Sequence, residues 1–135
     1  MTEPVRETGA MIAGIDPRLD GQAWCFVTAD DPSQVLELMR GALATFREDE
    51  ALSLIVPVEL AHEAGVEADP YARITLQVHS ALDGVGLTAA VAGALAEADI
   101  ACNMVAAYRH DHAFVPADRA DEAVEILRNL AASVA

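Results

Sequence analysis

The spacing of hydrophobic residues predicts a strand and then a helix in the second half of the chain. Ile74, Leu76 and Val78 alternate with polar residues, which predicts a strand over residues 74–79 with one face in a core. After a glycine-containing loop, a second set of apolar residues follows the period of an α-helix: Leu87, Val91, Ala94, Leu95 and Ala98.

Two further strands and a second helix complete this half. Residues 100–107 and 112–115 are apolar runs that predict strands, and Asp118 is a candidate N-cap for a final helix. The buried face of that helix is predicted to hold Ala120, Ala123, Val124, Leu127, Leu130 and Ala131. The predicted order from residue 74 onward is therefore βαββα.

The apolar residues of the first half predict similar elements, although their spacing is less regular. Residues 11–15 fit a short strand or one helical turn, and residues 24–27 fit a buried strand. After Pro32, a short run of apolar residues with helical spacing predicts a short helix. Residues 42–56 predict a hairpin around an acidic tip, with a longer helix as the alternative for its first part. Pro57 is well placed in the first turn of a further helix.

A repeated string links the two halves. Val56-Pro57, Ala61 and Glu63-Ala64 recur at a constant offset as Val115-Pro116, Ala120 and Glu122-Ala123. The alternative is chance, because alanine and glutamate are common in this chain. Duplication predicts two copies of one unit, residues 1–70 and residues 71–135.

The second half resembles the core signature of ACT domains. The resemblance rests on the strand over residues 74–79, the Asp-x-x-Gly-Leu string at 83–87, the Leu-Ala-Glu-Ala end of the helix at 95–98 and the strand that begins with Ile100. With the string from Tyr108 to Pro116 added, the whole chain is similar to small stand-alone proteins made of two ACT units. The resemblance implies an α+β fold with tandem ferredoxin-like βαββαβ units, antiparallel sheets and helices on one face.

The resemblance also implies an amino-acid-binding regulatory unit, with the ligand held where two ACT units meet, against the loop after the first strand. Gly84 and Gly86 permit close approach of a ligand, and the helix N-terminus attracts a carboxylate. Asp83 can pair with an ammonium group, although it alternatively only caps the helix while the glycines turn the chain. The candidate ligand-binding residues are Asp83, Gly84, Val85, Gly86, Leu87, Thr88 and Asn103.

Three histidines and a carboxylate form a second candidate site. In a βαββα unit the tip of the second hairpin lies near the end of the first strand, which predicts that His110, Asp111 and His112 lie close to His79. Imidazole is the commonest metal ligand, so the group is a candidate zinc site. The alternatives are a hydrogen-bonded polar network and a binding site for a ligand carboxylate.

Composition narrows the classes of partner. The formal charge of −14 on 135 residues argues against nucleic acid, and the chain has no lysine, which excludes Schiff-base chemistry and a Walker-type phosphate loop. The sequence shows neither a membrane span nor a signal peptide, and Cys25 and Cys102 lie in apolar runs, so a cytoplasmic protein with reduced cysteines is expected.

The sequence is compatible with three functions. The sequence favours a homodimeric protein, without catalytic activity or a cofactor, that binds an amino acid or a similar zwitterion. The first alternative is a dimerisation or interaction module with no small ligand. The less favoured alternative is a metal-binding protein built on the histidines.

Overall fold

The computed structural model describes residues 3–134, which form two compact units. The small unit comprises residues 22–71, and the described part of the large unit comprises residues 3–21 together with residues 72–134. This division differs from the predicted boundary after residue 70, because residues 3–21 belong with the second half and Tyr71 belongs with the small unit. Their helix contributes Met11 and Ile12 to the hydrophobic core of the large unit.

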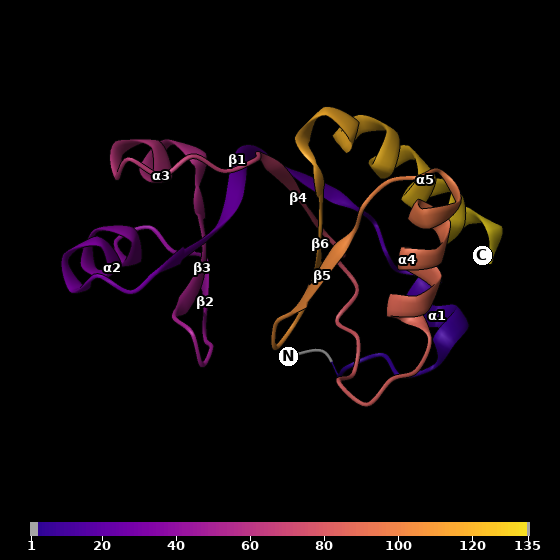
Figure 1. Ribbon diagram of the computed structural model, residues 1–135. Helices are drawn as coiled ribbons and strands as arrows, with labels where there is room; N and C mark the ends of the chain where they lie inside the picture. Colours follow the sequence, from indigo (N-terminus) through magenta and orange to yellow (C-terminus); the bar gives the residue numbers. More distant parts are fainter. Residues whose placement is uncertain (1–2, 135) are drawn as a thin grey trace. The chain divides into compact units, whose positions relative to one another are not determined.

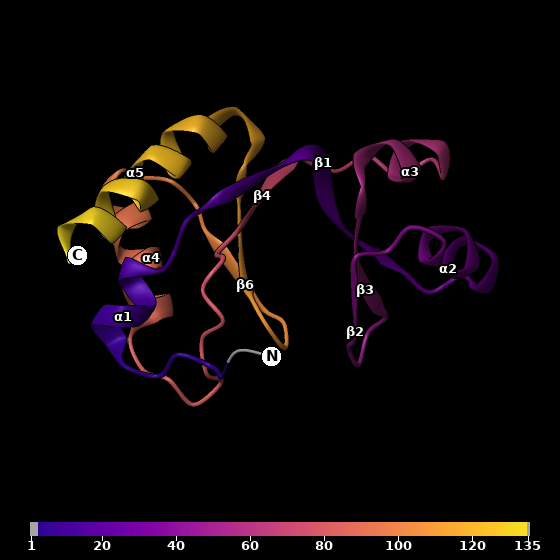
Figure 2. The same cartoon turned by 180° about the vertical axis from the view of Figure 1, so that it is seen from behind.

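The large unit packs its helices on one side of its strands. Its helices are α1 (Thr8–Ala13), α4 (Leu87–Glu97) and α5 (Ala120–Ser133), with a 3₁₀ turn, η1 (Ala117–Arg119), before α5. Its strands are β4 (Tyr71–Thr75), β5 (Asn103–Ala106) and β6 (Asp111–Pro116). β6 lies between β4 and β5 and is antiparallel to β5. In both views α1 lies beside α4 and α5, on the same side of these strands (Figures 1 and 2).

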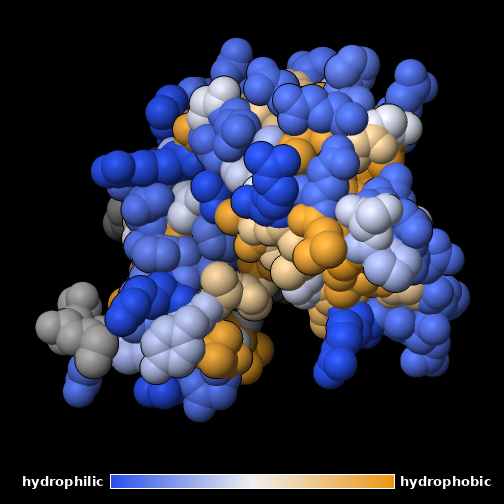
Figure 3. All heavy atoms as spheres, turned by 90° about the vertical axis from the view of Figure 1, so that its left-hand side faces the viewer, coloured by the Kyte–Doolittle hydropathy of each residue, from blue (hydrophilic) through white to orange (hydrophobic). Residues whose placement is uncertain are grey.

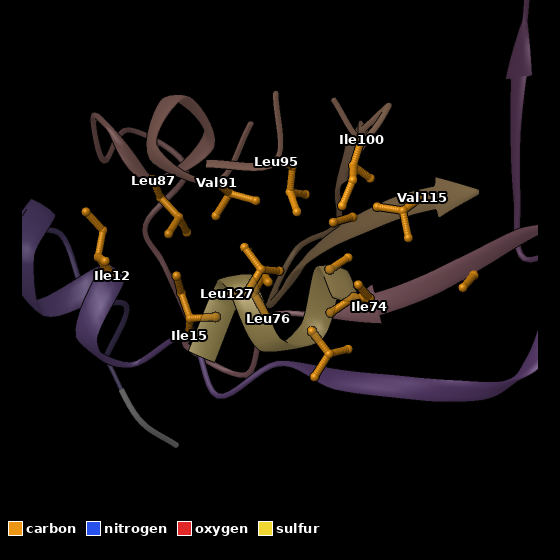
Figure 4. Close-up of a cluster of buried hydrophobic side chains, with 14 of the residues drawn as sticks. Ile12, Ile15, Ile74, Leu76, Leu87, Val91, Leu95, Ile100, Val115 and Leu127 are labelled. Atoms are coloured by element: carbon orange, nitrogen blue, oxygen red, sulfur yellow. The ribbon is translucent and has the colours of Figure 1, made fainter. Parts of the chain in front are cut away.

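The core of the large unit joins the three helices to the sheet. Figure 4 shows side chains of α1, α4 and α5 pointing toward those of the strands, with Leu76 and Leu127 near the middle. The stripe predicted for α4 is buried at Leu87, Val91 and Leu95. The face predicted for α5 is buried at its first four positions, whereas its last two, Leu130 and Ala131, are half-buried.

Two local predictions for the large unit are wrong. Asp118 does not cap α5: it lies within η1, and Arg119 occupies the N-cap position without a side-chain hydrogen bond. The first strand ends at Thr75 rather than His79. The chain leaves the strand there and bonds to the N-terminal segment, since Val5 N donates to His79 O at 2.7 Å and Ala81 N donates to Val5 O at 2.8 Å.

The small unit is a three-stranded sheet with two helices on one face (Figure 1). Its elements are β1 (Arg18–Ala29), which begins in the large unit, α2 (Pro32–Met39), β2 (Ala44–Arg47), β3 (Leu52–Pro57) and α3 (Val58–Glu63). β3 lies between β1 and β2 and is antiparallel to both, which confirms the predicted hairpin. Cys25, Leu38 and Val56 are fully buried in its core.

Several large apolar side chains of the small unit stay exposed. Leu36, Met39 and Phe46 are among them. Figure 3 views the side on which α2 and α3 lie in Figure 1 and shows a mostly hydrophilic face with apolar side chains gathered near its middle. The small unit therefore does not bury all of its large hydrophobic residues within itself.

The sequence repeat has a structural counterpart. β3 and β6 are each six residues long, have the same order of half-buried and buried positions, and end in Pro57 and Pro116. A helix follows each proline, but α3 has 6 residues whereas α5 has 14. The two copies therefore match closely in their third strand and diverge in the helix after it.

Among residues 3–134, no helix is long and apolar enough to cross a lipid bilayer. Cys25 and Cys102 are free thiols, and burial raises the pKa of each. Burial therefore favours the protonated thiol at both positions.

Candidate ligand-binding site

A pocket of about 170 Å³ lies in the large unit between the loop before α4 and the β5–β6 hairpin. Four of the predicted ligand-binding residues line it, Gly84, Gly86, Leu87 and Thr88, and so does Asp111 from the predicted polar cluster. The remaining lining residues are Met11, Ser80, Ala81, Leu82, Ala106 and Ala107. The pocket therefore combines the first turn of a helix, a carboxylate and several small apolar side chains.

The two glycines of the loop are held close to α1. Gly86 is the N-cap residue of α4 with a φ of 109°, a conformation that side-chain-bearing residues rarely adopt. A Cβ atom on Gly86 would lie 2.8 Å from Cγ2 of Thr8, and one on Gly84 would lie 2.9 Å from Sδ of Met11. Helix α1 thus accounts for both glycines through packing, and it also supplies Met11 to the pocket wall.

Asp111 is fixed at the opposite side of this pocket. It is the first residue of β6, and its backbone carbonyl oxygen accepts a hydrogen bond from Leu76 N at 2.9 Å. Its side-chain Oδ2 accepts a hydrogen bond from Ser80 Oγ at 3.0 Å. These bonds confirm that the hairpin tip lies beside the chain that leaves the first strand. The sequence does not predict Ser80 as a partner of Asp111, because the direction of the Ser80 side chain is set by the irregular segment after β4.

Two predicted residues of the loop face away from the pocket. Asp83 accepts a hydrogen bond from Arg6 Nε at 3.0 Å, and the side chains of Arg6 and Asp83 are 65% and 74% exposed. Asp83 therefore neither lines the pocket nor caps α4. It borders a neighbouring hollow of about 270 Å³ with Arg6, His79 and Tyr108. The Val85 side chain is exposed, while its carbonyl oxygen accepts a hydrogen bond from Thr8 Oγ1 at 2.6 Å.

The predicted residue Asn103 lies apart from the pocket. It is the first residue of β5 and pairs with Phe114, whereas the pocket is lined by Ala106 and Ala107 at the other end of that strand. Three residues of a β-strand span about 10 Å, so Asn103 does not reach the pocket.

The predicted histidine cluster is divided in the structure. His112 Nδ1 lies 3.0 Å from Thr75 Oγ1, whereas His79 is among the residues that line the hollow beside Asp83. Burial lowers the pKa of His112, and nearby Arg73 and His110 lower it further against the opposing effect of Asp111. No three His, Cys, Asp or Glu side chains within residues 3–134 form a group that could hold a metal ion. His112 is therefore a hydrogen-bonded residue of the sheet, and its lowered pKa favours the neutral imidazole.

Comparison with known families now identifies the fold. The chain belongs to the ACT domain family: one ACT domain model matches residues 4–73 and another matches residues 70–129. The two ACT units are therefore in tandem, as predicted. Among curated proteins, none matches this chain.

Several solved structures share this fold. A Vibrio cholerae protein of unknown function, described as a possible transport protein, is 40% identical, with a TM-score of 0.77 over 88% of this chain and 92% of that one. An Agrobacterium tumefaciens protein is 19% identical, with a TM-score of 0.65 over 82% of this chain and 84% of that one. The ligand-free regulatory subunit of aspartate kinase from Thermus thermophilus is 13% identical, with a TM-score of 0.60 over 84% of this chain and 95% of that one. The last two likenesses show the fold alone.

Proposed function

We propose that this protein is a regulatory protein that binds a small amino acid, or a similar zwitterion, in the pocket between the loop before α4 and the β5–β6 hairpin. The observation that carries the proposal is that the carboxylate of Asp111 and the first turn of α4 line the same pocket. The first N–H groups of a helix have no acceptor within the helix and favour a carboxylate. Asp111 favours an ammonium group.

The size and lining of the pocket favour a ligand with a short side chain. Its volume of about 170 Å³ lies below the range of about 300–1,000 Å³ that is usual for drug-sized ligands. Apart from Ser80 and Thr88, the side chains around Asp111 are apolar and mostly small, as Ala81, Ala106 and Ala107 are. We therefore expect a small aliphatic or hydroxyl-bearing amino acid.

The regulatory role rests on the family and on the likeness of fold to regulatory subunits. We also infer that the protein acts as a homodimer, with the second copy covering exposed apolar residues of the loop before α4 and of the β5–β6 hairpin. Leu82, Val85 and Tyr108 are 74%, 78% and 75% exposed. Side chains of this size are seldom left exposed together unless a partner covers them.

A thermal-shift screen of the twenty amino acids, at millimolar concentration, tests the proposal. One amino acid, or a small related group, is expected to raise the melting temperature, because a ligand that binds only the folded state stabilises it. Calorimetry should then give a saturable isotherm. No shift with any amino acid would overturn the proposal.

The second candidate function is an interaction module with no small ligand. The packing of Thr8 and Met11 against Gly86 and Gly84 favours it, because α1 occupies part of the space over the loop. The same screen separates the two functions: the interaction module predicts a stable dimer by light scattering whose melting temperature no amino acid changes.

A further inference from the structure

The small unit contains a hollow of its own beside α3. It has a volume of about 390 Å³ and is lined by Cys25, Val58, Ala61, His62, Val66, Glu67, Ala68 and Asp69. This volume is in the usual range for small-molecule sites, about 300–1,000 Å³. Within the small unit, the segment equivalent to the loop before α4 is the link from β1 to α2, and no residue of that link lines the hollow. The hollow is therefore not the repeat of the amino-acid pocket.

The repeat explains why the hollow exists. Aligning Pro57 with Pro116 places Gly65 at the position of Val124 and Ala68 at the position of Leu127. In the large unit, Val124 is 7% exposed and Leu127 is 0% exposed, and both lie on the buried face of α5 in the core.

The small unit has no such side chains to bury. Its helix α3 ends at Glu63, and Gly65 has a φ of 76°, which turns the chain away from a helical path. The segment that follows carries a glycine and an alanine where the other copy has valine and leucine, so the equivalent space is left open.

The floor and the rim of the hollow differ in chemistry. Cys25 and Ala61 at the floor are buried, and burial raises the pKa of the Cys25 thiol, so the floor is uncharged. The exposed lining residues are His62, Glu67 and Asp69, of which two carry carboxylates, and none of the lining residues is an arginine. An apolar floor under two carboxylates suits a ligand with an apolar body and a positive charge.

We propose that this hollow is a second binding site, which takes a small organic ammonium ion. The apolar part of the ion lies on Cys25, Val58 and Ala61, and its ammonium group lies between Glu67 and Asp69. A zwitterion is excluded from the hollow, because its carboxylate would face the two rim carboxylates. The two sites of the chain thus differ in the charge of the ligand they accept.

Titration of the protein with n-butylamine, which is a cation at pH 7, tests the proposal. Saturable binding is expected by calorimetry, with chemical-shift changes in NMR spectra confined to the residues that line the hollow. The neutral analogue 1-butanol should bind at least tenfold more weakly. Equal binding of 1-butanol, or a response to n-butylamine that never saturates, would overturn the proposal.

Two charge variants separate this site from general attraction to an acidic protein. Glu67→Gln combined with Asp69→Asn should weaken binding of n-butylamine at least tenfold. The control, Glu59→Gln combined with Glu63→Gln, removes the same charge from α3 at residues that do not line the hollow, and should change binding less than twofold. Equal losses in both double variants would show that the hollow is not the site.

A third variant tests the shape of the hollow without changing its charge. Ala68→Leu restores the residue found at the equivalent position of α5, and its side chain should fill the space over Ala61. Binding of n-butylamine should be lost while the melting temperature is kept or raised. Unchanged affinity in a folded Ala68→Leu protein would contradict the proposal, and the two charge variants decide the matter if that protein does not fold.

Discussion

The hydroxyl group of Thr8 donates a hydrogen bond of 2.6 Å to the carbonyl oxygen of Val85, which joins α1 to the loop before α4 across 77 positions of the sequence. An isolated helix of six residues is not stable by itself, so α1 depends on such anchors. Glu7 adds another, because its carboxylate accepts hydrogen bonds from Gly9 N at 3.0 Å and Ala10 N at 2.6 Å. The position of the loop before α4 is therefore coupled to the N-terminal segment.

Replacement of Thr8 tests that coupling. Thr8→Val removes the hydroxyl group and leaves the shape of the side chain, so it should lower the free energy of unfolding by about 0.5–1.5 kcal/mol. Thr8→Ser keeps the donor and serves as the control, with a smaller loss. Urea denaturation measures both, and equal stability of the valine variant and the native protein would show that the bond contributes nothing.

Substitutions of two glycines, one at the start of α4 and one within it, should change stability in opposite directions. Gly86→Ala should destabilise the protein by about 1–3 kcal/mol, because it puts a side chain on strained backbone, and the new Cβ would lie 2.8 Å from Cγ2 of Thr8. Gly93→Ala is the matched control, since Gly93 is exposed within α4 and a Cβ there meets nothing within 4 Å. It should stabilise the helix by about 0.5–1 kcal/mol. The same urea measurements decide, and a stabilising effect of both substitutions would refute the role given to Gly86.

Local patterns predicted the elements of the fold but not the contacts of the N-terminal segment. The stripe of Leu87, Val91 and Leu95 predicts α4 because helix period and burial agree there. By contrast, the bond from Thr8 to Val85 joins residues whose types are compatible with many other partners. Nothing in residues 3–13 indicates that they pack on a loop more than 70 positions away, which explains why they were assigned to the first unit.

The candidate site was predicted in part for the same reason. Glycines before a helix and a carboxylate at a hairpin tip are visible in the sequence, and both meet at the pocket. The alternation of the first strand was extended to His79, but the strand ends at Thr75, so the direction of the side chains beyond it cannot be obtained by counting residues. Counting residues therefore predicts that His79 lies with His110 and His112, whereas the structure places His79 and His112 in different surroundings.

The protonation of His112 should make stability depend on pH. Its pKa in the folded state is below the ordinary value of 6.5, because of burial and then Arg73 and His110. As the pH falls below about 6.5 the unfolded chain takes up a proton that the folded protein does not, so the free energy of unfolding decreases until the pH reaches the lower folded-state pKa. Above that window the residue makes no pH-dependent contribution.

Comparison with a variant isolates this effect from the other titrating groups. His112→Asn removes the titration and retains a polar side chain near Thr75. Its free energy of unfolding, measured between pH 7.5 and pH 5, should fall less steeply than that of the native protein. If the free energies of unfolding of the variant and the native protein depend equally on pH, the pKa of His112 is the same in the folded and unfolded states.

The choice of aspartate is the most direct test of the proposed amino-acid site, because the chain offers two candidates, Asp83 in the loop before α4 and Asp111 at the start of β6. Asp111 lines the pocket, whereas Asp83 is paired with Arg6 outside it. Asp111→Asn keeps the size of the side chain and removes the charge that would bind the ammonium group. A charged hydrogen bond contributes about 1.5–3 kcal/mol, so the Kd of the amino acid that gives the largest thermal shift should rise roughly tenfold to a hundredfold.

Asp83→Asn makes the identical chemical change and should leave that Kd within about twofold, since Asp83 does not reach the pocket. Ser80→Ala frees the Asp111 carboxylate, which Ser80 Oγ now holds at 3.0 Å, and removes one hydroxyl group from the pocket wall, so it should have an intermediate effect. If Asp83→Asn weakens binding and Asp111→Asn does not, the ligand lies in the hollow beside Arg6 and His79 rather than between α4 and the hairpin.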